Sequence, residues 1–254
     1  MPRYFLELSY KGTAYSGFQV QDNARTVQSE TEAALRVFFR DSFVLTGSSR
    51  TDAGVHALQN YFHFDTAIPI SQRNVYNLNA ILPPDISVKG IYRVPDQAHC
   101  RFDALAREYR YYIYREKDPF RNDRGWLYPY PLDLDLLNQG ATLLKGYEDF
   151  TSFSKRNTQV NNFRCQIQES EWVMEQGQLV YQVKANRFLR GMVRGLVGTM
   201  VRLGRGQLGI DGFRSVIEAK DCSKADFSTP AQGLFLKRVC YPEALSAVLK
   251  TPGL

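Results

Sequence analysis

The chain has 254 residues, 44% of them hydrophobic and 23% charged, which is enough to bury one large core or two smaller ones and excludes a disordered or fibrous protein. It contains no run near the roughly 18 apolar residues of a membrane span. Its beginning, "MPRYFLELSY", is strand-like rather than a secretory leader, so we expect a cytoplasmic protein. The formal net charge of +6 favours a polyanionic partner such as nucleic acid.

Cysteine and histidine are too sparse and scattered to indicate a metal site. The four cysteines include no C-x-x-C pair, so neither a zinc site nor a disulfide framework is predicted. The three histidines, His56, His63 and His99, lack the paired spacing of metal ligands, and His63 is interpreted as a structural residue of a strand. We therefore expect no catalytic metal.

The first half of the chain alternates between strand and helix patterns. A helix is predicted over residues 26–39, with Thr26 as its N-cap, and another over 71–82, stopped by Pro83 and Pro84. Strands are predicted over residues 3–10, 42–48, 59–66 and 86–94. The resulting order is βαββαβ.

The second half repeats this order. Strands are predicted over residues 105–114, 163–174, 179–185 and 233–241, and helices over 133–146, from Arg187 onward and over 209–220. We predict an α+β fold of two ferredoxin-like halves, residues 1–104 and 105–254. Each half is expected to be an antiparallel sheet with helices on one face, and the active-site cleft is expected between the halves.

A loop of unusual chemistry begins at Gly47, in the stretch "GSSRTDAGVHALQNYFHF". The corresponding connection in the second half is the tight turn "EQGQ", and loops at the end of a rigid sheet often carry function. Asp52 in this loop is either a turn residue or an ionised nucleophile. A hydrolase triad of Ser48 or Ser49 with Asp52 and His56 is disfavoured, because no G-x-S-x-G elbow is present and the residues lie close in sequence.

The stretch "NRFLRGMVRGLVGTMVRLGR" predicts a helix with an apolar face and a basic, glycine-rich face. The apolar arc holds Leu189, Met192, Val193, Leu196, Met200 and Leu203, and the opposite arc holds Arg187, Arg190, Gly191, Arg194, Gly198 and Arg205. A glycine inside a helix costs about 1 kcal/mol relative to alanine. We therefore expect another backbone or a ligand to approach this face closely, and packing under a neighbouring loop is the simpler alternative.

Arg194 lies among small and apolar residues of this helix. A guanidinium in such surroundings requires a carboxylate or phosphate partner. We predict that its partner is Asp52, because a neighbouring arginine keeps an aspartate ionised, as a nucleophile must be.

The segment "RTDAGVHA" resembles the signature of the TruA-type tRNA pseudouridine synthases, which isomerise uridines 38 to 40 of the tRNA anticodon arm. Further motifs occur in the order found in that family: "YKGTAYSGFQVQ", "LNAILP", "CRFDALAREYRYYIY", "DFTSFS", "NRFLRGMVR" and "AQGLFL". Two positions depart from the family pattern: Ser49 stands where glycine is frequent and Cys100 where alanine is common. Neither position matches a reacting group.

The resemblance assigns roles to individual residues. It implies that Asp52 is the nucleophile, that Tyr109 stacks on the target base and takes part in the later proton removal, and that Arg194 pairs with Asp52. It also implies that Leu234 packs against the base and that Arg50 fills the space left by the flipped nucleotide.

The resemblance further implies a homodimer that binds tRNA across both subunits and needs no metal or cofactor. The "GFQ" pattern assigns Gln19 to the RNA surface. On charge alone, we expect Arg187, Arg190 and Arg205 to contact phosphates without reading bases.

A non-catalytic RNA-binding protein on the same fold is the alternative function. RNA-binding modules of ferredoxin-like fold display aromatic residues in a K/R-G-F/Y-G/A-F-V-x-F/Y stretch, and no segment here matches it. That alternative also leaves Asp52 unexplained, because a carboxylate repels phosphate.

Overall fold

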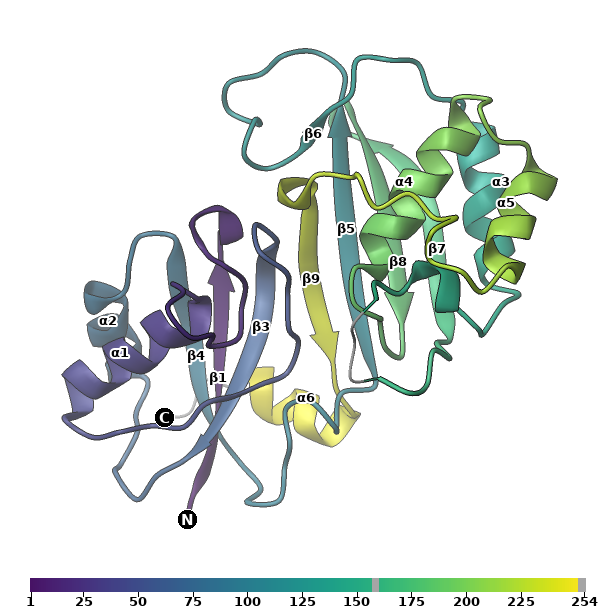
Figure 1. Ribbon diagram of the computed structural model, residues 1–254. Helices are drawn as coiled ribbons and strands as arrows, with labels where there is room; N and C mark the ends of the chain where they lie inside the picture. The colour runs from purple at the N-terminus through teal and green to yellow at the C-terminus, as the bar shows by residue number, and fades with distance from the viewer. Residues whose placement is uncertain (157–159, 251–254) are drawn as a thin grey trace. The chain divides into compact units, whose positions relative to one another are not determined.

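The computed structural model describes residues 1–156 and 160–250 and is shown in Figure 1. Its internal contacts divide the chain into two compact units. The first unit contains Met1–Ala106 and the described residues from Leu236 onward, and the second contains Arg107–Phe235. The predicted second half is residues 105–254, whereas these contacts group Leu236 and the described residues after it with the first unit.

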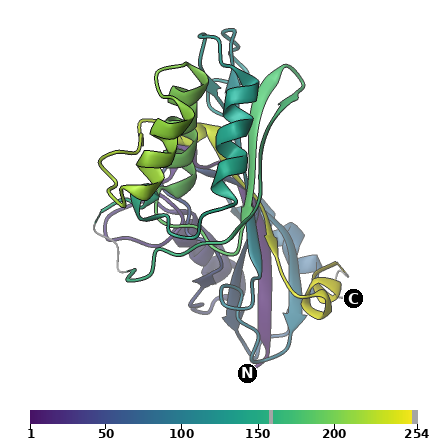
Figure 2. The same cartoon turned by 90° about the vertical axis from the view of Figure 1, so that its right-hand side faces the viewer.

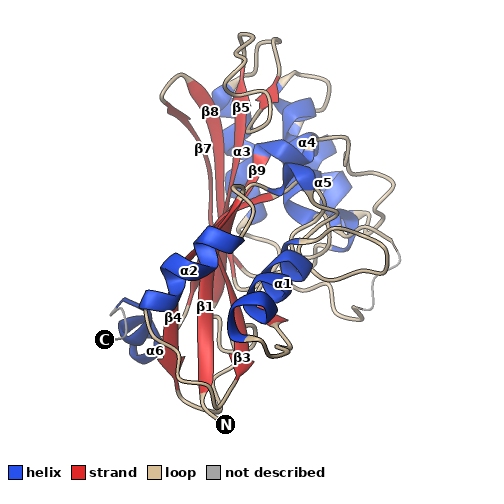
Figure 3. Cartoon of the chain, turned by 90° about the vertical axis from the view of Figure 1, so that its left-hand side faces the viewer, coloured by secondary structure: helices blue, strands red, loops and turns tan. Residues whose placement is uncertain are grey.

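The first unit is built on three long antiparallel strands. Its elements are β1 (Arg3–Tyr10), α1 (Val27–Phe39), β2 (Thr46–Gly47), β3 (His56–Asp65), α2 (Arg73–Ile81) and β4 (Ile86–Val94). β1 lies between β3 and β4, so that Phe5 faces His63 on one side and Tyr92 on the other. Figure 3 shows α1 and α2 on the same face of these strands.

Helix α1 begins where the sequence predicted. Thr26 and Ser29 form a capping box, in which each side chain accepts a hydrogen bond from the other residue's backbone N–H. The buried face of α1 includes Val27, Ala34 and Leu35, which pack into the core of the first unit. The predicted N-cap at Thr26 is confirmed.

The second unit has a three-stranded antiparallel sheet covered by helices. Its elements are β5 (Ala106–Tyr114), β6 (Trp126–Leu127), α3 (Leu134–Leu144), β7 (Ile167–Glu175), β8 (Gln178–Ala185), α4 (Met192–Gly204) and α5 (Ile210–Glu218). β8 pairs with both β5 and β7. Figure 2 shows α3 and α5 in the helical layer beside these strands, and the Trp172 indole of β7 donates to the sulfur of Met200 on α4.

The last strand, β9 (Leu234–Cys240), leads back into the first unit, where it neighbours β3 and is followed by α6 (Glu243–Lys250). The backbone N–H of Val239 donates to the Gln59 side chain on β3 at 3.2 Å. Tyr241 then packs its ring against Phe5 of β1. The ring contact anchors the end of β9 on the core of this unit.

The α+β fold class is confirmed, but several predicted elements differ in extent: β7 begins at Ile167 instead of 163 and β3 at His56 instead of 59. The strand predicted over 42–48 is reduced to β2, Thr46–Gly47. The helix predicted from Arg187 begins at Met192, because Gly191 before it has φ +73°, a left-handed conformation that ends the preceding turn. The helix α6 was not predicted. Among the described helices, none has the length and apolarity that crossing a bilayer requires.

Candidate active site

Asp52 lies half-buried in the loop 48–55 that joins β2 to β3. The backbone carbonyl of Asp52 accepts a hydrogen bond from the N–H of Val55 at 3.1 Å. Gly54 follows with φ +79°, which a glycine adopts without steric cost. These features give the loop a tight turn directly after Asp52.

Hydrogen bonds of buried polar side chains hold the loop in place. The hydroxyls of Tyr10 and Thr51 are hydrogen-bonded at 2.7 Å. The Asn60 amide donates to the Tyr10 hydroxyl at 3.2 Å and to the carbonyl of Ser49 at 2.8 Å. Asn60 is completely buried and Tyr10 and Thr51 are nearly so, which makes each of these bonds costly to leave unmade.

The segment after β1 approaches the loop so closely that glycine is required there. A Cβ on Gly12 would lie 2.0 Å from the carbonyl oxygen of Val55, and the N–H of Gly12 donates to Nδ1 of His56 at 3.0 Å. The N–H of Phe18 donates to the carbonyl of Thr51 at 3.1 Å. The loop is therefore fixed to this segment through backbone contacts as well as side chains.

Other predicted residues of this unit differ in their surroundings. Arg50 in the loop and Gln19 in the segment after β1 are exposed, as residues that contact RNA must be. Ser49 is 8% exposed, and its hydroxyl has no hydrogen-bond partner among the described residues. The residue that departs from the family pattern thus introduces a buried, unsatisfied hydroxyl.

The glycine-rich face of α4 packs under a loop of its own unit. A Cβ on Gly198 would lie 2.3 Å from the carbonyl oxygen of Asp226, and one on Gly195 would lie 2.8 Å from the ring of Phe227. The N–H of Asp226 also donates to the Thr199 hydroxyl at 3.0 Å. The simpler alternative, packing under a neighbouring loop, therefore accounts for Gly195 and Gly198.

The prediction of a basic face on this helix is wrong, because most of the arginines assigned to that face do not lie on the helix. Arg187 and Arg190 precede α4, and Arg190 is exposed. Arg205, at the C-cap, packs its guanidinium 4.4 Å from the ring centre of Tyr130 and donates to the Tyr128 hydroxyl at 2.9 Å. Of these arginines, only Arg194 lies on the helix itself.

Arg194 is half-buried, and segment 226–229 holds it in place. Its Nε donates to the carbonyl of Thr229 at 2.7 Å, and the Thr229 hydroxyl donates back to the carbonyl of Arg194 at 2.6 Å. The first bond restrains the guanidinium, and the second ties segment 226–229 to the backbone of α4. The pairing of Arg194 with Asp52 would join the two units and stays a prediction.

Tyr109 and Leu234 are buried apolar surfaces of the second unit. Tyr109, on β5, is 8% exposed, and its ring meets that of Phe188 edge-on with the centres 5.0 Å apart. Leu234, the first residue of β9, is also buried. The neighbouring Tyr111 donates to the carbonyl of Pro230, and its burial raises its pKa above the usual value, so its role is packing.

His63, His99 and Cys100 form the cluster that comes nearest to a metal site in the part of the chain that the structure describes. The Cys100 thiol donates to the carbonyl of Thr46 at 3.1 Å and lies 3.2 Å from Nδ1 of His63. Nδ1 of His99 accepts from the N–H groups of Arg101 and Phe102. A cation would have to displace these bonds, so the arrangement favours a structural role.

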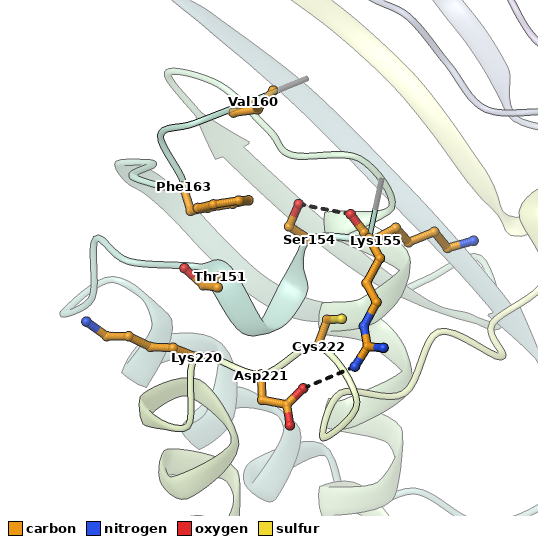
Figure 4. Close-up of a pocket in the computed structure, with 9 residues that line it drawn as sticks. Thr151, Ser154, Lys155, Val160, Phe163, Lys220, Asp221 and Cys222 are labelled. Atoms are coloured by element: carbon orange, nitrogen blue, oxygen red, sulfur yellow. Dashed lines mark hydrogen bonds and ion pairs between the residues drawn. The ribbon is translucent and has the colours of Figure 1, made fainter. Parts of the chain in front are cut away.

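A cavity of about 350 Å³ in the second unit is lined by Thr151, Ser154, Lys155, Phe163, Lys220, Asp221 and others (Figure 4). Its basic side chains do not converge on one point. Figure 4 shows Lys155 and Lys220 extending in opposite directions, and the ammonium of Lys220 pairs with Asp149 at 3.0 Å. The cavity therefore lacks the focused positive charge of an anion site.

Sequence reasoning missed the residues that hold the loop. Tyr10 is the first letter of the motif "YKGTAYSGFQVQ", and Asn60 follows Gln59 in a strand that also carries His63 and Asp65. Nothing in the sequence indicated that Asn60 is completely buried, and burial is what makes a hydrogen-bond partner necessary. The partners of Tyr10 and Asn60 could not be identified without the fold.

Comparison with known proteins agrees with the motifs. A family model described as tRNA pseudouridine synthase matches residues 8–103 and 141–242. The chain is 46% identical over 250 residues to tRNA pseudouridine synthase A of Parabacteroides distasonis, covering 98% of this chain and 99% of that one. It is 44% identical to the protein of that name from Bacteroides thetaiotaomicron (96% and 92% covered) and 38% identical to that from Staphylococcus aureus (95% and 92%).

Proposed function

The chain belongs to the tRNA pseudouridine synthase family, a family of isomerases, and on that premise we propose that it converts uridines 38, 39 and 40 of the tRNA anticodon arm to pseudouridine with Asp52 as nucleophile. The main support for the proposal is the structural environment of Asp52. Its loop is fixed by buried hydrogen bonds, while the residue itself stays accessible. A turn residue would not need such support.

The proposed reaction begins with a flipped nucleotide, because a stacked and paired uridine hides both the anomeric carbon and carbon 5. Flipping costs a few kcal/mol. The Asp52 carboxylate then bonds covalently to the uridine as the N1–C1′ bond breaks. The base turns, C5 bonds to C1′, the C5 proton leaves, N1 gains a proton and the bond to Asp52 is released. The sum is an isomerisation without any co-reactant, and we propose that it proceeds without a metal or cofactor.

The second unit supplies the remaining roles in this proposal. Arg194 pairs with the Asp52 carboxylate, and its bond to Thr229 supports that role because it orients the guanidinium. Tyr109 stacks on the base and takes part in removing the C5 proton, and Leu234 packs against the base. The burial of both side chains supports a water-poor pocket.

Contacts to the rest of the tRNA fall to the exposed residues Arg50, Gln19 and Arg190 and the half-buried Arg187. Arg50 fills the space left by the flipped nucleotide, and Gln19, Arg187 and Arg190 contact the RNA around it. The excess of positive charge supports a tRNA partner. We further propose a homodimer that binds tRNA across both subunits, and a cytoplasmic location, where tRNA is found.

Tritium release from tRNA labelled at carbon 5 of uridine tests the proposal. We expect release by the native protein and none by Asp52→Asn, a nearly isosteric change that removes the charge, while tRNA binding persists. Asp41→Asn is the matched control, because Asp41 is an exposed aspartate of the same unit, and it should release tritium at the native rate.

Each other outcome has a definite meaning. Equal release by native protein and Asp52→Asn would mean that Asp52 is not the nucleophile. Binding without release, on a tRNA with uridines at positions 38 to 40, would favour the non-catalytic RNA-binding alternative.

A further inference from the structure

The motif "YKGTAYSGF" has no part in the proposed chemistry, yet it forms the support of the Asp52 loop. Tyr10 contributes a hydroxyl to Thr51, Gly12 an N–H to His56, and Phe18 an N–H to the carbonyl of Thr51. These bonds explain why the two motifs occur together.

Both peptide planes that flank Asp52 are held. The carbonyl before Asp52 is that of Thr51, which accepts from Phe18, and the carbonyl after it is that of Asp52 itself, which accepts from Val55. Because peptide units are planar, fixing both planes fixes the Cα of Asp52 and the direction of its Cα–Cβ bond. The side chain keeps only its own rotamers.

Tyr10 connects these planes to the sheet. Its hydroxyl lies between the Thr51 hydroxyl and the Asn60 amide, and Asn60 in turn binds the carbonyl of Ser49 and accepts from the N–H of Tyr61. The hydroxyl thus joins β1, β3 and the loop at one buried point. Without the Tyr10 hydroxyl, the Thr51 hydroxyl and the Asn60 amide would each lose one hydrogen-bond partner.

We propose that Tyr10 is a positioning residue for catalysis, acting through Thr51 to hold Asp52 in its reactive place. This inference rests on the proposed function, because it assumes that Asp52 reacts. Misplacing a reacting group by about 1 Å can cost roughly 100-fold in rate. We therefore expect Tyr10→Phe to slow tritium release about 10- to 100-fold at saturating tRNA, with unchanged tRNA affinity.

A set of matched variants separates positioning from general loss of stability. Tyr92→Phe is the control, because Tyr92 is also a buried tyrosine of the first unit and its hydroxyl donates to Glu7 at 3.1 Å, away from the loop. Thr51→Val should reproduce the defect and Thr51→Ser should restore the rate. If Tyr10 acts through Thr51, the double variant Tyr10→Phe with Thr51→Val should be no slower than Tyr10→Phe alone.

Hydrogen exchange of loop 48–55 supplies a readout that does not need activity. Tyr10→Phe should speed exchange in this loop, and Tyr92→Phe should not. Unchanged loop exchange, or equal rates of release by Tyr10→Phe and Tyr92→Phe, would overturn the inference. If Tyr10→Phe speeds loop exchange but the native protein releases no tritium, the proposed function is overturned. The conclusion that Tyr10 restrains the loop would still be supported.

Discussion

The Asp52 loop and the helix α4 both bring two backbones close together at glycines, but they hold them differently. At the loop, Gly12 admits the Val55 carbonyl, and buried side chains of Tyr10, Thr51 and Asn60 complete the contact. At α4, Gly198 admits the Asp226 carbonyl, and the helix around it is almost wholly buried. Directional hydrogen bonds restrain both contacts, and at α4 they come from Arg194, Asp226 and Thr229. The helix differs from the loop in that close packing also covers nearly all of its residues.

The largest expected effect is at the loop contact itself. Gly12→Ala places a Cβ 2.0 Å from a backbone oxygen, so the loop must move. We expect a loss of about 3 kcal/mol in the free energy of unfolding, the upper end for overpacking. Urea denaturation measures it, with Gly146→Ala as control, because a Cβ there meets only ordinary contacts. A loss equal to that of the control would contradict the close contact.

The equivalent change on the helix should cost less. Gly198→Ala meets the Asp226 carbonyl at 2.3 Å, but alanine regains about 1 kcal/mol of helix propensity, so we expect a net loss of about 2 kcal/mol. Gly195→Ala meets a phenyl ring, which can shift, and should be nearly neutral. Thermal melting compares the two. A larger loss at Gly195 than at Gly198 would reverse our account of this face.

These glycines show what the sequence could and could not predict. The helix pattern and the cost of glycine predicted a close approach, and Thr26 predicted the start of α1, because both follow from local rules. That the approaching segment is 226–229 could not be predicted, since it depends on contacts distant in sequence. The prediction wrongly put Arg187 and Arg190 on the helix. The cause is local, because Gly191 in the left-handed region separates them from α4.

A smaller effect of opposite sign is expected at Ser49. Its buried hydroxyl has no partner among the described residues, and an unsatisfied polar group is destabilising. Ser49→Ala should therefore raise the free energy of unfolding by about 1 kcal/mol. Urea denaturation of the native protein and of Ser49→Ala shows whether the free energy of unfolding rises or falls. A loss of stability would mean that the hydroxyl has a partner after all.

A pH effect separates the two units, because all three histidines lie in the first. Burial, with the nearby His99 and Arg3, lowers the pKa of His63 to about 4 from 6.5. The unfolded chain therefore binds more protons than the folded one between these values, so stability falls as the pH drops from about 6.5 toward 4.

Urea midpoints at pH 7 and pH 5 test this sign. From pH 7 to pH 5, the native protein should lose more stability than His63→Gln does. Each loss is measured relative to the same protein at pH 7. Parallel losses in both proteins would assign the acid sensitivity to other groups.

The return of β9 to the first unit has a consequence for synthesis on the ribosome. The second unit is continuous, Arg107–Phe235, and is complete before the part of β9 that starts at Leu236 emerges. Until then β3 lacks its β9 neighbour, and its exposed backbone donors and acceptors can pair with another chain. We therefore expect nascent chains that stall before Leu236 to be the species most prone to aggregate.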